Sequence, residues 1–391
     1  MKTIGIVAEY NPFHTGHAYH IQGTRRLLGG ECAVVAVMSG NWVQRGECAV
    51  TDKWTRTEMA LAGGVDLVLE LPTVWAAASA EGFARGAVSI LAATGVVDTL
   101  SFGSECGEVT PLLKLARCLN SPEFSHALRR ELEPKRSFVQ SRRQAAERLL
   151  GPETAALLDF PNNNLGVEYL RFLPPNMEAV TIPRRGAGHD STAEEDGFPS
   201  ASLLRRWIRA GEMERASPFL SLCWNGEAAD LMWLERTVIA RLRSMSPEEA
   251  EALPDSGDGL AARLLCAARQ TADLEELYAL SKTRTYAHAR VRRLAVYALL
   301  GLRRQDIPAA PPYIRVLGFN RRGQALLREM NQKASCPFFV KPAHIRRYSP
   351  QSQALFALEE RFTDLFSLCF PTPRPCGLEW TANPVIRKEG P

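Results

Sequence analysis

Two histidines three residues apart, His14 and His17, follow an apolar run that ends at Ala8. This spacing places both imidazoles on the first turn of a following helix, where backbone N–H groups lack partners and the helix dipole is positive. Such a turn favours phosphate groups. Two imidazoles there could donate hydrogen bonds to a triphosphate as its charge redistributes, which stabilises a transition state electrostatically. The segment therefore predicts a nucleotide site.

Two other interpretations of the histidine pair are core packing or capping, and zinc binding. Zinc sites need further ligands at characteristic spacings, and neither histidine is followed by them. We therefore predict no metal site in the protein itself. In the same segment, Pro12 stiffens the approach to the helix, and Gly16 removes a side chain where a nucleotide would approach the backbone.

A second polar segment places Ser200 and Ser202 before Arg205 at the start of a predicted helix, residues 200–210. Hydroxyls, backbone N–H groups and a guanidinium would converge where the β- and γ-phosphates of a nucleotide could bind. The alternative is a serine N-cap followed by a solvated arginine. Together with the histidine pair, the segment favours triphosphate binding.

The first 105 residues alternate short apolar runs with amphipathic stretches, and this alternation would position both segments. It predicts an α/β fold with a doubly wound parallel sheet, whose ligand lies beyond the carboxyl ends of the strands. The expected strands are 3–8, 33–39, 65–71, 97–102 and 179–183, and the expected helices are 17–28, 52–62 and 80–93.

The rest of the chain has a different pattern. Residues 108–175 are mostly helical and basic, which predicts a helical insertion, and residues 186–197 form a polar, glycine-rich loop. From about residue 211 the pattern turns almost purely helical. We therefore expect a catalytic domain over residues 1–210 and a mostly α-helical C-terminal domain over residues 211–391.

Composition narrows the class of protein. The chain has 391 residues, of which 46% are hydrophobic and 23% charged, as in ordinary soluble globular proteins. No stretch of eighteen uncharged apolar residues predicts a membrane span, and the N-terminus has no export-signal pattern. Nine scattered cysteines without a CxxC pair suit reduced thiols. We expect a cytoplasmic protein.

Basic residues form clusters although the net charge is only +4. In the cluster over residues 282–293, helical spacing would place Tyr286, Arg290 and Arg293 on one face. Such a face could pair with RNA backbone phosphates and stack an unpaired base on the tyrosine. The alternative is a solvated amphipathic helix.

The histidine motif together with the hydroxyl-rich segment resembles the HIGH-motif nucleotidyltransferase superfamily, which has a Rossmann-like catalytic domain. Longer strings resemble the tRNA(Met) cytidine acetate ligase family, and the similarity spans most of the chain. These strings are residues 5–17, 39–47, 52–56, 66–72, 102–105, 162–166, 184–190 and 282–294. Cys48 departs from the family pattern, which has proline there, and Ser202 stands in place of a threonine.

The resemblance implies a two-step reaction. Acetate and ATP would give acetyl-adenylate and pyrophosphate, and the acetyl group would then pass to the wobble cytidine of elongator tRNA(Met), giving 4-acetylcytidine and AMP. The ATP contacts that it implies are Ile6, Val7, Ala8, Glu9, Tyr10, Asn11, Pro12, Phe13, His14, Thr15, Gly16, His17, Ala18, Tyr19, Gly103, Asn162 or Asn163, Arg184 and Arg185. The implied partners are tRNA and acetate, without a membrane or DNA.

The chemistry of acetate activation agrees with these residue types. In-line displacement of pyrophosphate by a carboxylate needs orientation and charge neutralisation more than a nucleophilic side chain. His14, His17, Arg205 and a Mg²⁺ ion could supply both.

Polar residues after the second strand are candidates for the acetate pocket or for holding the adenylate. We expect Arg45 and Lys53 to take part in catalysis as cations, with Asn41 and Gln44 beside them. The alternative is ordinary loop polarity and salt bridging.

Two other functions remain open from the residues alone. A small-molecule nucleotidyltransferase that joins AMP or CMP to a metabolite would have a similar N-terminal site. A non-catalytic RNA-binding protein regulated by a nucleotide is the third interpretation, although binding alone would not require both imidazoles.

Overall fold

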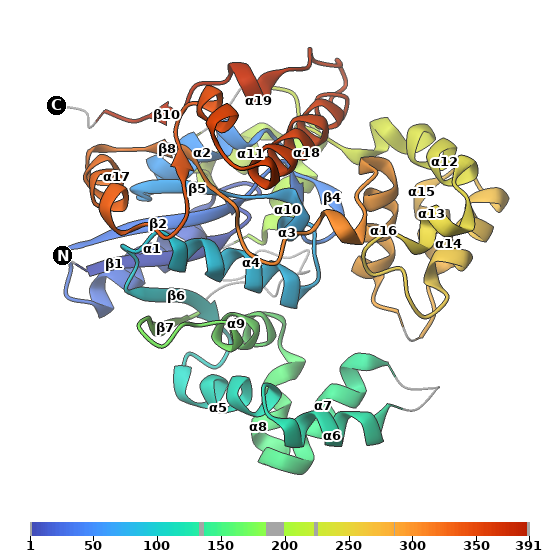
Figure 1. Ribbon diagram of the computed structural model, residues 1–391, viewed down its shortest axis with the longest axis horizontal. Coiled ribbons are helices and arrows are strands. Elements are labelled where there is room, and N and C mark those ends of the chain that lie inside the picture. Colours follow the sequence, from blue (N-terminus) through green and yellow to red (C-terminus); the bar gives the residue numbers. More distant parts are fainter. Residues whose placement is uncertain (1, 133–136, 185–198, 223–225, 285, 389–391) are drawn as a thin grey trace.

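The computed structural model describes residues 2–132, 137–184, 199–222, 226–284 and 286–388 (Figure 1). Arg185 and the expected loop over residues 186–197 lie outside the described residues.

A parallel sheet forms the centre of the N-terminal half. Its strands are β1 (Lys2–Ala8), β2 (Cys32–Ser39), β5 (Leu67–Leu71), β6 (Thr99–Ser104) and β7 (Glu178–Pro183), in the spatial order β5-β2-β1-β6-β7. The chain moves from β1 to β2 and β5 on one side, and then crosses to β6 and β7 on the other. The doubly wound parallel sheet predicted from the sequence is confirmed, with its topological switch point between β1 and β6.

Helices cover both faces of this sheet because successive strand side chains point to opposite faces. In β2, Val34 belongs to the apolar cluster shared with α1 (Thr15–Leu27) and α2 (Lys53–Ala62), whereas Val35 belongs to the cluster shared with α4 (Ala80–Ala93). All eight residues of β2 are buried, as expected for a central strand covered on both sides.

The C-terminal half also contributes strands to this sheet. β8 (Ile314–Phe319) pairs antiparallel with β5, and both β9 (Phe338–Phe339) and β10 (Val385–Ile386) pair parallel with β8. The expectation of an almost purely helical chain after residue 211 was therefore wrong at these strands. Arg315 interrupts the apolar run of β8 in the sequence, but it is buried and paired with Glu379. The domain boundary near residue 210 stays a prediction.

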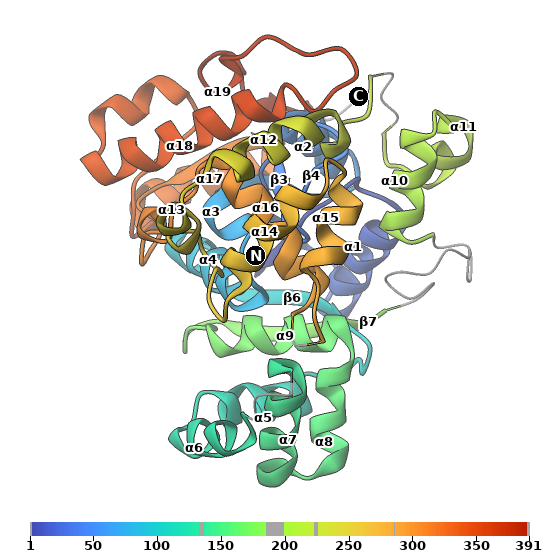
Figure 2. The same cartoon turned by 90° about the vertical axis from the view of Figure 1, so that its right-hand side faces the viewer.

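Helices also fill the segment between β6 and β7. They are α5 (Val109–Leu119), α6 (Pro122–Glu131), α7 (Phe138–Leu150), α8 (Pro152–Ala156) and α9 (Pro161–Arg171). α9 packs against α4 and β6, and the others project away from the sheet beyond it (Figures 1 and 2).

The remaining helices follow β7, and α12 to α16 gather on one side of the sheet (Figure 2). Their bounds are α10 (Ala201–Arg209), α11 (Met213–Ala216), α12 (Glu235–Ser244), α13 (Pro247–Glu251), α14 (Leu260–Gln270), α15 (Leu274–Ser281), α16 (His288–Leu300), α17 (Arg321–Lys333), α18 (Pro350–Phe366) and α19 (Leu378–Thr381). A short helix, α3 (Thr73–Ala76), follows β5. Over the described residues, no helix has the length and apolar character to cross a membrane.

A fully buried arginine of α2, Arg56, holds together the turns at the carboxyl end of the sheet. Its guanidinium donates to the carbonyl oxygens of Glu9 (2.7 Å), Ser39 (3.1 Å) and Thr51 (3.1 Å), and to that of Gly40. Burial lowers its pKa to about 10, so it is still charged at neutral pH. One cation thus satisfies several carbonyl groups that follow β1 and β2.

Replacing this guanidinium should destabilise the whole protein. In Arg56→Met the carbonyl oxygens would be buried without donors, and we expect the free energy of unfolding to fall by at least about 3 kcal/mol. Urea denaturation measures this change. Arg328→Met, on the exposed side of α17, is the control and should change stability by less than about 0.5 kcal/mol. Equal losses in the two variants would contradict the role given to Arg56.

Candidate active site

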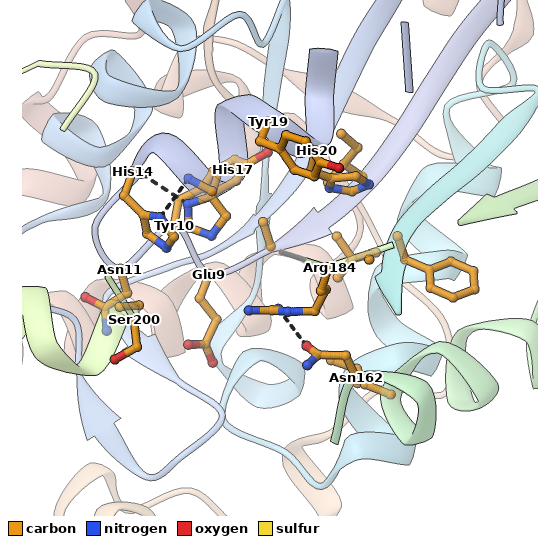
Figure 3. A pocket seen from close by; sticks show the side chains of 18 of the residues that line it. Glu9, Tyr10, Asn11, His14, His17, Tyr19, His20, Asn162, Arg184 and Ser200 are labelled. Carbon is orange, nitrogen blue, oxygen red and sulfur yellow. Dashed lines mark hydrogen bonds between the residues drawn. The ribbon is translucent and has the colours of Figure 1, made fainter. Parts of the chain in front are cut away.

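A cavity of about 240 Å³ opens at the carboxyl ends of β1, β6 and β7 (Figure 3). The start of α1, the N-terminal turns of α9 and α10, and the loop after β2 complete its walls. It therefore lies at the topological switch point of the sheet, where ligands of doubly wound folds bind.

His14 and His17 fix one another on the wall formed by α1. His14 is the N-cap residue, and its Nδ1 accepts the N–H of Gly16 at 3.1 Å. The N–H of His14 in turn donates to Nδ1 of His17 at 3.2 Å, and the ring centroids lie 4.0 Å apart. Because each Nδ1 accepts a hydrogen bond, each neutral ring carries its proton on Nε2. Each imidazole thus offers one N–H donor on the wall of the cavity.

Burial keeps the His17 ring neutral. It lowers the pKa of this side chain well below the ordinary value, and the nearby His14, Arg184 and His20 side chains lower it further, because each disfavours a positive charge on His17. At neutral pH His17 is therefore an uncharged hydrogen-bond donor.

Gly16 is needed for a reason that the sequence did not indicate. A Cβ atom at this position would lie 2.8 Å from Cε1 of His14. The missing side chain therefore makes room for the His14 imidazole. Gly16 also lines the cavity, and the expected approach of a nucleotide to its backbone stays a prediction.

The opposite wall carries Arg184, which follows β7 (Figure 3). Its Nη1 donates to Oδ1 of Asn162 at 2.8 Å, and Nδ2 of Asn162 donates to Glu105 at 2.6 Å. The Glu105 carboxylate also accepts the N–H groups of Asn162 and Asn163 at the start of α9. A carboxylate held by a helix N-terminus thus orients the amide that orients the guanidinium.

Asn163 serves the fold rather than the cavity. It is fully buried, and its Oδ1 accepts the N–H groups of Glu105 (2.9 Å) and Cys106 (3.1 Å). Of the two neighbouring asparagines that the sequence left open, Asn162 is the one that lines the cavity.

Arg205 of α10 lines the cavity from a third side. Its Nη1 donates to the carbonyl oxygen of Asn11 at 3.0 Å, and its Nη2 donates to Oγ of Ser202 at 3.1 Å. Ser200 is the N-cap of α10, and its Oγ accepts the N–H of Leu203. The serine therefore caps the helix and also lines the cavity.

A hairpin of β3 (Trp42–Val43) and β4 (Glu47–Cys48) brings Gln44 and Arg45 into the wall. The N–H of Gln44 donates to Oε1 of Glu9 at 3.0 Å. Strand β4 of the hairpin is also held from outside the cavity, because Nη1 of Arg292 on α16 donates to Oε1 of Glu47 at 2.6 Å.

Comparison with known proteins agrees with this architecture. The family model described as HIGH Nucleotidyl Transferase matches residues 1–377. A protein of Acetivibrio thermocellus named tRNA(Met) cytidine acetate ligase is 35% identical over 419 residues, covering 99% of this chain and 100% of the relative. One of the same name from Alkaliphilus metalliredigens is 36% identical and covers 94% of each chain.

This chain belongs to the tRNA(Met) cytidine acetate ligase family. Two crystal structures of Thermotoga maritima TmcAL have the same fold. The apo form superposes with a TM-score of 0.93 at 32% identity, and the form bound to alpha-thio ATP superposes with a TM-score of 0.90 at 31% identity. Each comparison covers 99% of this chain and 100% of the other.

The structure places most of the predicted nucleotide contacts around the cavity. Those that line it are Ile6, Val7, Ala8, Glu9, Tyr10, Asn11, His14, Gly16, His17, Tyr19, Gly103, Asn162, Arg184 and Ser200. Those that do not line it are Pro12, Phe13, Thr15, Ala18, Asn163 and Ser202. Phe13, for example, is fully buried and packs against the rings of Tyr10 and His17.

Lys53 and Asn41 were wrongly placed in the acetate pocket. Lys53 is fully buried and pairs with Glu70 (2.5 Å) and Glu379, and burial lowers its pKa to about 8. Asn41 accepts the N–H of Lys53 and donates to Thr363 of α18 at 3.0 Å. These residues anchor the hairpin to the C-terminal helices. Their polarity in the sequence reflects buried pairing rather than a ligand.

The segment around α16 differs from the single helical face that was expected. The helix begins at His288, so Tyr286 precedes it. Arg293 is only 8% exposed and donates from Nε and Nη2 to one Asp255 oxygen. Arg290 donates to the Asp258 carboxylate and to main-chain carbonyls of the same loop. Both guanidiniums therefore help to fix a turn, and the role of this segment in tRNA binding stays a prediction.

Sequence reasoning missed several wall residues, among them His20, Phe83, Phe102 and Tyr169. His20 shares a 2.9 Å hydrogen bond with Oγ of Ser101, and burial, assisted by Arg184, lowers its pKa to about 4. Its position three residues after His17, on the same helix face, was the available signal. The aromatic residues come from separate elements, and local periodicity cannot bring them together.

Replacing Asn163 tests the two hydrogen bonds that join it to the loop after β6. Asn163→Ala would leave two partly buried N–H groups without their acceptor, and we expect the free energy of unfolding to fall by about 2 kcal/mol, about 1 kcal/mol for each lost hydrogen bond. Chemical denaturation measures it, with Asn331→Ala on the exposed side of α17 as control. A loss no greater than that of the control would show that the two N–H groups find other acceptors.

Proposed function

We propose that this chain is an ATP-dependent ligase that acetylates the wobble cytidine of elongator tRNA(Met) in the cytoplasm, giving 4-acetylcytidine, AMP and pyrophosphate. The names of its relatives and the alpha-thio ATP complex of Thermotoga maritima TmcAL support the substrates. The observation that carries the proposal is the switch-point cavity, where two imidazole donors face several guanidiniums.

In the first step an acetate oxygen attacks the α-phosphorus of ATP. The new O–P bond forms as the bond to pyrophosphate breaks, and negative charge moves onto the leaving group. His14 and His17 supply N–H donors, and Arg184 and Arg205 supply positive charge. Donors that are already oriented stabilise this charge without reorganisation. No covalent intermediate on the protein is needed.

In the second step the exocyclic amine of cytidine attacks the acetyl carbonyl. The C–N bond forms, the C–O bond to AMP breaks, and the amine loses a proton. Arg45 and Gln44, at the hairpin tip, are our candidates for holding the acetyl end of the adenylate, because they line the cavity beside Glu9.

Magnesium enters this proposal only as the counter-ion of the nucleotide. In the described part of the chain, no three His, Cys, Asp or Glu side chains are grouped to hold a metal ion. In this proposal Mg²⁺ would be held by phosphate oxygens and water. It would supply charge neutralisation.

Pyrophosphate exchange distinguishes this proposal from the two other functions. The ligase should exchange labelled pyrophosphate into ATP only when acetate is present, and without tRNA. A small-molecule nucleotidyltransferase would instead need its metabolite and yield a stable dinucleotide-type product. A non-catalytic RNA-binding protein would show no exchange. Exchange that is independent of acetate would refute the proposal.

The imidazole donors should matter for rate more than for binding. His14→Ala and His17→Ala should each lower the rate of acetate-dependent exchange by about 100-fold, with a much smaller change in KM for ATP. The control is His126→Ala, at an exposed position on α6. A large rise in KM with an unchanged maximal rate would mean that the rings act in ground-state binding.

A further inference from the structure

Glu9 is a carboxylate in a cavity that otherwise presents guanidiniums and N–H donors. It is the residue directly after β1. Figure 3 shows its side chain below the histidine pair, with Asn11 and Ser200 to its left and Arg184 and Asn162 to its right. A negative charge repels a triphosphate, and more strongly where water is excluded. Nucleotide binding therefore does not explain a carboxylate here, and another part of the reaction should require it.

Glu9 is fixed on both its main chain and its side chain. Its carbonyl oxygen accepts from Arg56 at 2.7 Å, and its Oε1 accepts the N–H of Gln44 at 3.0 Å. Within the described residues, Oε2 makes no hydrogen bond. The carboxylate is thus held by one oxygen and retains acceptor capacity on the other.

The surroundings of Glu9 make it a stronger base than an ordinary carboxylate. Burial raises its pKa above the usual value, and the negative charge of Glu47 adds to this. The Gln44 N–H, together with the positive charges of Arg205 and Arg45, opposes the rise. The buried Arg56 guanidinium and the Tyr169 hydroxyl also face it. A base works best when its pKa approaches the working pH.

We propose that Glu9 binds the exocyclic amine of the target cytidine and accepts its proton during acetyl transfer. This assignment rests on the proposed function. The N4 nitrogen of cytosine donates its lone pair to the ring, so it attacks weakly unless a base removes a proton. Carboxylates are the side chains that accept hydrogen bonds from this amine in nucleic acids.

In acetyl transfer, every bond formed is matched by a bond broken when Glu9 is the only proton acceptor. The N4 lone pair forms the bond to the acetyl carbon, and the C–O bond to the phosphate breaks, with its electron pair leaving on AMP. The N4 proton passes to Oε2 of Glu9 and then to solvent. No oxidant, reductant or further reactant takes part.

The test separates the two steps by using prepared acetyl-adenylate. The enzyme is mixed with acetyl-adenylate and a tRNA(Met) transcript under single-turnover conditions, and 4-acetylcytidine is measured by mass spectrometry of nucleosides. Glu9→Gln should lower this transfer rate by about 100-fold, while acetate-dependent pyrophosphate exchange falls by less than about tenfold. Glu9→Asp, which keeps the carboxylate, should recover part of the transfer.

Glu58→Gln is the matched control. It removes an equal charge at an exposed position of α2 that does not line the cavity. Its transfer rate should remain within a few-fold of the wild type. An equal loss in both variants would mean that charge alone matters, and would overturn the assignment.

The pH profile of the wild type gives a second test that needs no variant. Glu9 must be deprotonated to act, so the transfer rate should rise with pH through a pKa above that of an ordinary glutamate and then level off. The transfer rate of Glu9→Gln should not rise with pH in this way. The midpoint of thermal unfolding of this variant shows whether it is folded.

Other outcomes overturn the assignment in distinct ways. Parallel losses in exchange and transfer for Glu9→Gln would place Glu9 in ATP positioning. A normal transfer rate in that variant would remove it from the reaction. Wild-type enzyme that shows neither exchange nor transfer would refute the proposed function itself.

Discussion

The arrangement of the cavity depends on one buried cation. Arg56 donates to the carbonyl oxygens that follow β1 and β2, so the turn bearing Glu9 and the turn leading to the hairpin share one fixed point. A guanidinium suits this place because its donors are fixed in a plane and stay charged when buried. The sheet brings the strand ends together, and Arg56 determines how the loops leave them.

The partners of the charged residues separate structural cations from those that can meet an anion. Lys53 and Arg293 are paired with buried or partly buried carboxylates, so their charge is already neutralised. Arg184 and Arg205 instead donate to amide, carbonyl and hydroxyl oxygens. These bonds orient a guanidinium without cancelling its charge. A phosphate chain in the cavity would therefore meet arginines that are oriented but still positive.

Some of this site could be predicted from the sequence, and the rest required the fold. The strand pattern and the spacing of His14 and His17 are local, so they correctly indicated the doubly wound sheet and a helix N-terminus beside it. The partners of Lys53 are remote, since Glu379 lies 326 residues away in the sequence. The sequence alone does not distinguish a lysine in a polar loop from a lysine in a buried ion pair. Similarly, β8 was missed because the charge of Arg315 is neutralised only in three dimensions.

The attachment of the β3–β4 hairpin to α18 has a consequence for synthesis of the protein. Nε1 of Trp42 donates to the carbonyl oxygen of Phe362, and Asn41 bonds Thr363, both more than 300 residues later in the sequence. The hairpin that forms part of the cavity wall is thus anchored by a segment that is synthesised more than 300 residues after it. A polypeptide that ends before α18 contains the turn that faces the nucleotide. It lacks the residues that anchor the hairpin. The wall formed by the hairpin therefore gains its anchor only after α18 has been synthesised.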